Sequence, residues 1–309
     1  MDATHDVWEG FEVMRGQRVA GALSLVLYSI VALGVASRLV LHIRHHSSIR
    51  RVVFHVLLLA AILGDMPFSF QAVFFPRSQR WIAAFVCELF ADTMLCCSLA
   101  LLSISWARVA MVGHYAKGPV RFRRFIIAIT FAMVAAMLST DAAMLTYADD
   151  LDGVDEYNGS VLHMLIVTLG SIVILFTSGL LLFQASRIYK RMQQSRGILS
   201  PDDFARSAKK LFVSVWIIML CTVLRVFFLV CDACEFPFVE EMDIVPHTVW
   251  ASLVPDVFPV ICLLYLQRRM PAPKRAATGA ADDMLQTVTA TMDSSWADHD
   301  SPEAMTSAA

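Results

Sequence analysis

The stretch VLHMLIVTLGSIVILFTSGLLLFQA, residues 161–185, contains no Asp, Glu, Lys or Arg. About 20 such residues are needed for an α-helix to cross the ~30 Å hydrocarbon core of a bilayer. A helix is required, because lipid does not tolerate unpaired backbone polar groups. Similar stretches lie on both sides of this one, at 19–40, 52–75, 81–107, 125–147, 211–231 and 248–266. The sequence therefore predicts an all-α polytopic membrane protein with seven transmembrane helices.

The composition agrees with this class and sets the domain organisation. Hydrophobic residues make up 57% of the chain and charged residues 17%, whereas about 25% of a soluble domain is charged. We expect a short N-terminal segment, 1–18, followed by one seven-helix domain, 19–270. The remaining segment, 271–309, is rich in Ala, Thr, Ser and Asp, a composition that predicts a disordered tail.

The charge of the connecting segments alternates along the chain and predicts the orientation in the membrane. The basic segments are 41–51, 108–124 and 186–210. The acidic segments are 1–18, 148–160 and 232–247. Arg77 and Arg80 in the short loop 76–80 are an exception, because this loop lies on the predicted lumenal side. The other loops all follow the charge pattern, so we base the orientation on them. Because Lys and Arg are enriched in cytosolic loops, we expect a lumenal or extracellular N-terminus and a cytosolic C-terminus.

Two basic segments place clusters of positive charge on the predicted cytosolic side, where those of segment 186–210 could meet lipid headgroups or a protein partner. Ser200, Pro201, Asp202 and Asp203 are typical of a helix start, so the sixth helix is expected to begin in the cytosol near Pro201. It would then present three basic residues, which join three more from loop 108–124. The six residues are Arg206, Lys209, Lys210, Arg121, Arg123 and Arg124. The alternative is simple anchoring of these charges at the membrane surface.

Two features are expected on the lumenal side. Cys231 and Cys234 lie at the lumenal end of the sixth helix, where they form either a disulfide or two free thiols. Asn158 begins the sequence Asn158-Gly159-Ser160, which is an acceptor for N-glycosylation. No second Cys or His cluster accompanies the two cysteines, so no zinc site is expected.

Ionisable residues inside membrane helices are costly and indicate function. Five of them are predicted to lie in the lumenal half of the bundle: Asp65, Glu88, Asp92, Arg225 and Asp256. A sixth, Asp141, lies in the fourth helix. One interpretation is an ion pair of Arg225 with Asp256 or Glu88, the surplus acids being neutral. The other is a cation or proton site formed by Asp65, Asp92 and Asp256. Pro255 and Pro259 predict an irregular seventh helix.

No enzyme class fits the sequence, and we expect no cofactor. The chain has no nucleophile motif and no phosphate-binding loop, and His42, His45 and His46 lie in a basic loop where they are expected to contact solvent or lipid headgroups. Nothing in the sequence indicates nucleic-acid binding or a particular oligomeric state. An ion or proton conductor using the intramembrane acids stays open, although transporters usually contain inverted repeats.

A divergent receptor that couples to a cytosolic signalling protein is another alternative. Seven helices and an outside N-terminus are typical of that architecture. The third helix ends Ser105-Trp106-Ala107-Arg108, however, without an acidic-Arg-aromatic triplet. The seventh helix has no lysine, which excludes a retinal Schiff base of the microbial type.

From the second helix to Arg275 the chain resembles the tobamovirus multiplication protein family, seven-helix proteins of plant vacuolar membranes with lysosomal receptor-like relatives in animals. The matching features include Trp106, Cys221 and Leu224-Arg225. The longer matching stretches are RVVFH at 51–55, LFTSGLLL at 175–182, LVPDVFP at 253–259 and LQRRMP at 266–271. The chain has Asp65 where the family pattern has arginine, and Asp256 where it has glutamate.

The resemblance implies a non-enzymatic role at a vacuolar or lysosomal-type membrane rather than the plasma membrane. It also implies binding of cytosolic partners, including small GTPases of the Arf-like or Rag type. The resemblance thus implies a membrane protein that docks or regulates such partners through the basic surface of loops 108–124 and 186–210, which carries the six basic residues named above.

Overall fold

The computed structural model describes residues 3–45, 47–75, 81–111, 118–147, 160–194, 201–234 and 236–267. Within these residues the regular structure is helical and contains no strand. The helices are α1 (Ala3–Arg44), α2 (Ile49–Phe74), α3 (Trp81–Met111), α4 (Gly118–Tyr147), α6 (Val161–Gln194), α7 (Pro201–Ala233), α8 (Pro237–Glu240), α9 (Ile244–Thr248), the π-helical turn η2 (Val249–Leu253) and α10 (Val254–Leu266). Seven helical segments are long and apolar enough to cross a membrane, the seventh running from α9 to α10. The predicted fold class is therefore confirmed.

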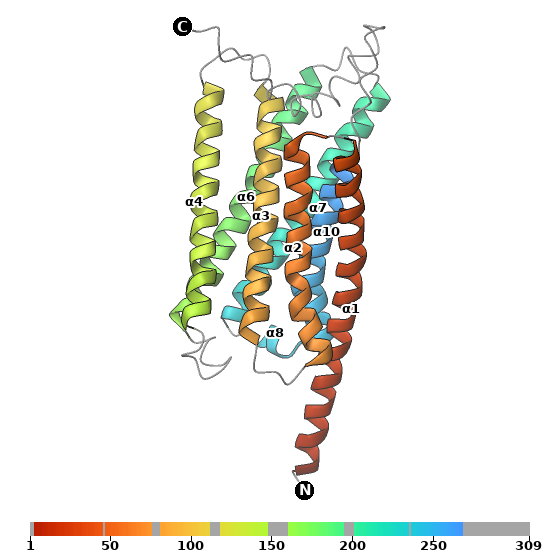
Figure 1. Ribbon diagram of the computed structural model, residues 1–309, viewed down its shortest axis with the longest axis vertical. Helices are drawn as coiled ribbons and strands as arrows, with labels where there is room; N and C mark the ends of the chain where they lie inside the picture. Colours follow the sequence, from red (N-terminus) through yellow and green to blue (C-terminus); the bar gives the residue numbers. More distant parts are fainter. Residues whose placement is uncertain are drawn as a thin grey trace.

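Six of the membrane-spanning segments form a closed ring, and α4 lies outside it. Helix α1 packs on α2, α2 on α3, α3 on α6, α6 on α7, and α7 on α10, which returns to α1. Helix α4 packs against α3 and α6, and it stands at one edge of the bundle (Figure 1). Consecutive spans run in opposite directions, so the start of α1 and the end of α10 lie at opposite ends (Figure 1).

We name the two ends of the bundle by the charge of their connections. The basic end holds the α1–α2, α3–α4 and α6–α7 connections and the end of α10. The acidic end holds the start of α1, the α2–α3 and α4–α6 connections, and α8. Which end faces the cytosol stays a prediction from the charge of the loops.

Several helices continue beyond the apolar stretches that predicted them. Helix α1 begins at Ala3 rather than at residue 19, α6 continues to Gln194 rather than ending at 185, and α7 begins at Pro201. The start at Pro201 agrees with the helix-start signal in the sequence. Helical hydrogen bonds do not require an apolar surface, so a helix does not have to end at the edge of the membrane.

Apolar side chains lie both in the core and on the outer surface, as expected for a helical bundle in lipid. Fully buried side chains from five helices, among them Phe54, Leu102, Leu181, Ile218 and Leu263, fill the centre. Large apolar side chains such as Phe131 and Leu220 face outward, 74% and 69% exposed. Such a surface is unfavourable in water and suits a hydrocarbon solvent.

Two glycines allow unusually close contact between the first three helices. A Cβ atom on Gly64 would lie 2.9 Å from both the Cβ of Ala91 and the carbonyl oxygen of Cys87 on α3. A Cβ atom on Gly21 would lie 2.9 Å from Ala72 Cβ and from the Ser69 carbonyl oxygen on α2. Small residues commonly permit such helix contacts in membranes, and Gly64 directly precedes Asp65.

The seventh span is irregular, as its prolines predict. The turn Val249–Leu253 is π-helical and leads into Pro255 at the start of α10. A π-turn inserts extra backbone into a helix and is frequent at functional sites. This irregular turn lies beside the buried charges described next.

Candidate functional site: a buried charge cluster

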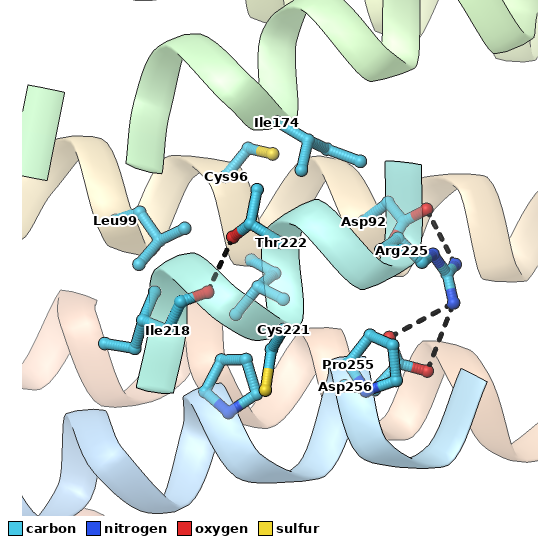
Figure 2. A pocket seen from close by; sticks show the side chains of 12 residues that line it. Asp92, Cys96, Leu99, Ile174, Ile218, Cys221, Thr222, Arg225, Pro255 and Asp256 are labelled. Carbon is cyan, nitrogen blue, oxygen red and sulfur yellow. Dashed lines mark hydrogen bonds and ion pairs between the residues drawn. The ribbon is translucent and has the colours of Figure 1, made fainter. Parts of the chain in front are cut away.

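Arg225 of α7 is the centre of a cluster that joins α3, α7 and α10. Its Nη2 donates to Asp92 Oδ2 at 2.9 Å and to Glu88 Oε1 at 3.3 Å. Its Nη1 donates to Asp256 Oδ1 at 3.2 Å (Figure 2). The sequence predicted a pair with Asp256 or Glu88, and the structure brings both carboxylates to the same guanidinium together with Asp92.

The cluster is buried most deeply on the side of α7 and α10. The side chains of Arg225 and Asp256 are each 7% exposed, whereas those of Asp92 and Glu88 are 14% and 22% exposed. Buried ion pairs gain from the low dielectric but must offset the loss of hydration of both groups. Arg225 donates hydrogen bonds to all three carboxylates, and these bonds offset part of that loss.

A proline supplies Arg225 with a further acceptor. Pro255 has no N–H, so the carbonyl of Ala251, four residues earlier, loses its regular helical donor. Arg225 Nη1 donates to this carbonyl oxygen at 3.3 Å. The irregular turn thus becomes part of the cluster. This contact was not predicted from the sequence, although Pro255, which leaves the carbonyl four residues earlier without its helical donor, was the available signal.

Tyr28 of α1 extends the cluster to a fourth helix. Its hydroxyl donates to Asp256 Oδ2 at 2.9 Å, and the residue is 3% exposed. Tyr28 was not among the site residues predicted from the sequence. A tyrosine in the middle of an apolar helix needs a hydrogen-bond partner, and that requirement was the available signal.

Removing the hydroxyl of Tyr28 is expected to weaken the bundle. The variant Tyr28→Phe takes away a donor to a buried carboxylate, which we expect to cost about 1–3 kcal/mol. Thermal unfolding of the purified protein in detergent would measure this loss. Tyr265→Phe, a change on a 42% exposed tyrosine, is the matched control; an equal loss in both variants would contradict the role of Tyr28.

Asp65 of α2 lies beside the cluster without joining its hydrogen bonds. It is 8% exposed and interacts electrostatically with Asp256, Asp92, Glu88 and Arg225. Among the described residues its carboxyl group has no hydrogen-bond or ion-pair partner. Asp65 is therefore a buried acidic residue next to the cluster. Arg225, the arginine of the cluster, already binds three other acids.

A small cavity of about 30 Å³ adjoins the cluster (Figure 2). Asp92, Arg225 and Asp256 line it on one side, and Cys96, Cys221 and Pro255 contribute to the rest. This volume holds about one or two water molecules. Arg225 Nε is buried and has no partner in the described part of the chain, so a water in this cavity is a suitable acceptor for it.

Asp141 lies apart from Arg225 on the peripheral helix α4. It is 7% exposed, and Asp92 is the charged residue with which it interacts electrostatically. Its Oδ2 atom has no hydrogen-bond partner within the described residues. Asp141 is therefore a neighbour of the cluster rather than a member of it.

The basic end differs from expectation at His42. The prediction that His42 contacts solvent or headgroups is wrong, because this residue is 1% exposed. Helix α1 continues to Arg44, so the His42 ring packs on His55 of α2 with ring centroids 4.6 Å apart. Its Nδ1 lies 2.9 Å from Ser47 Oγ.

The basic residues of the predicted partner surface are partly described. Arg206 and Lys209 are exposed on the first turns of α7, and Arg124 is exposed on α4. Lys210 is half-buried, with its Nζ 4.7 Å from the ring centroid of Tyr265. The side chains of Arg121 and Arg123 lie outside the described residues.

Two cysteines, a glycosylation signal and the C-terminal tail are the remaining features predicted from the sequence. Cys231 and Cys234 are both free thiols in the structure, the first buried and the second exposed. Asn158 and the tail 271–309 lie outside the described residues. Within the described part of the chain no group of three or more His, Cys, Asp or Glu side chains could hold a metal ion.

The fold and the cluster define a polytopic helical membrane protein whose interior charges join α1, α3, α7 and α10. A comparison with models of known protein families finds no family that matches the chain. A comparison with curated proteins likewise finds no match. Membership of the tobamovirus multiplication protein family therefore stays a prediction from the residues quoted above.

Proposed function

We propose that this protein is a non-enzymatic membrane factor that docks or regulates a cytosolic partner at its basic end. A small GTPase is the partner class that we favour, and a vacuolar or lysosomal-type membrane is the location. Both follow from the family resemblance. The observation that supports docking is the extension of α6 and α7 beyond the length that a bilayer requires.

Helices α6 and α7 are longer than the hydrocarbon core is thick. Helices α6 and α7 contain 34 and 33 residues, and at ~1.5 Å per residue each is roughly 50 Å long. The hydrocarbon core is only ~30 Å thick. The excess of α7 carries Arg206 and Lys209 as exposed charges. A rigid helical projection with exposed positive charge suits an acidic protein surface.

The internal cluster supports a structural role more than reception of a ligand. Small-molecule sites usually enclose about 300–1,000 Å³, whereas the cavity beside Arg225 has about 30 Å³. A divergent receptor that binds a ligand at this cavity is therefore the less favoured alternative.

The packing towards the basic end disfavours the conductor alternative. Phe54, Leu102, Ile218 and Leu263 are less than 2% exposed and fill the core. An ion path needs polar groups or water along its full length. A flux assay in proteoliposomes separates the alternatives: we expect no ion flux above that of empty vesicles.

Charge reversal at the start of α7 tests the docking proposal. The variant Arg206→Glu with Lys209→Glu is expected to abolish recruitment of the partner while leaving the protein in its membrane. Lys210 is left unchanged because it packs on Tyr265. Pull-down of cytosolic proteins on immobilised protein, compared with the wild type, measures the effect.

The matched control reverses two charges at the acidic end. Arg15 and Arg18 lie on the first turns of the first apolar span, and their replacement by Glu should leave recruitment unchanged. Unchanged recruitment by the Arg206 and Lys209 variant would reject the proposed surface. Equal loss in both variants would also reject it, by indicating a nonspecific effect of charge.

A further inference from the structure

The first turns of α7 present two positive charges on an exposed face. Phe204, Ala208 and Leu211 are 7%, 8% and 4% exposed and pack this part of α7 into the core. Arg206 and Lys209 are exposed instead, and residues three apart lie on the same face of a helix. These two residues, the basic face of α7, are therefore held by a well-packed helix and point away from the bundle.

The last helix of the bundle ends next to this basic face. Helix α10 packs on α7 and ends at Leu266. The ring centroid of Tyr265 lies 4.7 Å from Lys210 Nζ. At ~1.5 Å per residue, Arg206 and Lys209 lie within roughly 6 Å of Lys210 along the axis of α7. The chain that follows α10 therefore starts beside the basic face.

The sequence beyond α10 contains a segment of the opposite charge. Residues 293–303, DSSWADHDSPE, include four acids and no Lys or Arg. The acids are Asp293, Asp298, Asp300 and Glu303. Trp296 lies among them, and the ring of a tryptophan can stack on the planar guanidinium of an arginine such as Arg206. The segment is thus complementary to the basic face in charge and in chemistry.

The length of the intervening chain allows the segment to reach the basic face. About 26 residues separate Gln267 from Asp293. A chain of that length and polar composition spans roughly 25–30 Å between its ends, which is more than the distance along α7 from Lys210 to Arg206. A tether of this kind keeps the segment near the face at an effective concentration on the order of millimolar. Even a weak attraction between the charges is then sufficient for contact.

We propose that the acidic segment 293–303 occupies the basic face of α7 in the same molecule, with its carboxylates paired to Arg206 and Lys209. Contacts between exposed charges are individually weak and are screened by salt, so the contact is reversible. The contact itself does not depend on the proposed function, whereas its consequence rests on it. A cytosolic partner that docks at the basic face has to displace the segment, which therefore inhibits docking.

Carbodiimide cross-linking of the purified full-length protein in detergent tests the contact. The reagent joins a lysine amine directly to a carboxylate that it touches, and mass spectrometry of the digested protein identifies the joined peptides. We expect Lys209 to be joined to segment 293–303. Arg206→Glu should lower the yield about fivefold by repelling the acids, and 1 M NaCl should also lower it, since the screening length is then only ~3 Å. Arg18→Glu, at an exposed arginine of the acidic end, is the matched control and should leave the yield unchanged.

Three results would overturn the inference. The first is the absence of a cross-link between Lys209 and segment 293–303 in the wild-type protein. The second is a yield that Arg206→Glu leaves unchanged or that Arg18→Glu lowers equally. The third comes from a mixture of isotopically light and heavy protein: cross-links that join light to heavy chains as often as chains of one kind would identify a second copy as the source of the segment.

Recruitment of the partner separates this inference from the proposed function. Replacing the four acids of segment 293–303 with Asn or Gln in the full-length protein removes the competitor, so we expect at least about twofold more small GTPase to be retained when partner is limiting. Loss of the cross-link alone rejects the inference and leaves the docking proposal standing. A cross-link that forms as expected, with no gain in retention after neutralisation of the acids, rejects the basic face as the docking surface.

Discussion

Replacing Arg225 with Leu is expected to destabilise the bundle by about 3–5 kcal/mol, the usual cost of breaking a buried ion pair by removing one partner. Arg225 binds Asp92, Glu88 and Asp256 and also the Ala251 carbonyl. Its loss leaves all of these acceptors without their shared donor in a membrane interior. Thermal unfolding in detergent and the yield of monodisperse protein measure the effect.

The same cluster predicts how the loss can be rescued. Adding Asp256→Asn to Arg225→Leu should restore part of the stability, because one stranded acid is removed. Further substitution of Asp92→Asn and Glu88→Gln should restore more, since each removes another acceptor of Arg225. Arg206→Leu, an exposed arginine on the same helix, is the control and should leave Tm unchanged. Absence of any rescue would contradict the proposed energetic coupling of these residues.

Replacing Gly64 with Val is expected to cost about 1–3 kcal/mol by forcing α2 away from α3. Even a single Cβ atom would approach the Cys87 carbonyl oxygen and Ala91 Cβ to 2.9 Å. Neither group can move easily, because one is backbone and the other is fixed to it. Helix separation would also move Asp65, the next residue, away from its place beside the cluster.

A glycine in open space provides the control for this substitution. A Cβ atom on Gly170 of α6 would have no described neighbour within 4 Å, so Gly170→Ala should stabilise the helix by up to about 1 kcal/mol. Thermal unfolding of both variants gives the comparison. A Gly64→Val protein as stable as the wild type would show that the α2–α3 contact relaxes without cost.

The number of spans could be predicted from the sequence because their lengths match the thickness of the bilayer. The depth of each ionisable residue followed from the rise per residue, which grouped Arg225 with Glu88 and Asp256. Depth does not give the rotation of a helix about its axis. The contacts of Arg225 with Asp92 and of Tyr28 with Asp256 depend on that rotation and therefore came from the structure.

The ends of the helices were the least predictable part of the fold. The apolar stretch near residue 40 ends before His42, so that histidine was expected in a loop. The helix continues to Arg44 and places the ring against His55. At Pro201 a specific capping signal was present, and there the start of α7 was predicted correctly.

Co-purification of the detergent-solubilised protein with cytosolic proteins, in GDP and in a non-hydrolysable GTP analogue, tests the docking function most directly. We predict that a small GTPase is retained in one nucleotide state only, and that the Arg206→Glu and Lys209→Glu variant loses it. Retention of a heterotrimeric G protein instead would favour a receptor. The absence of any nucleotide-dependent partner would contradict the proposed function.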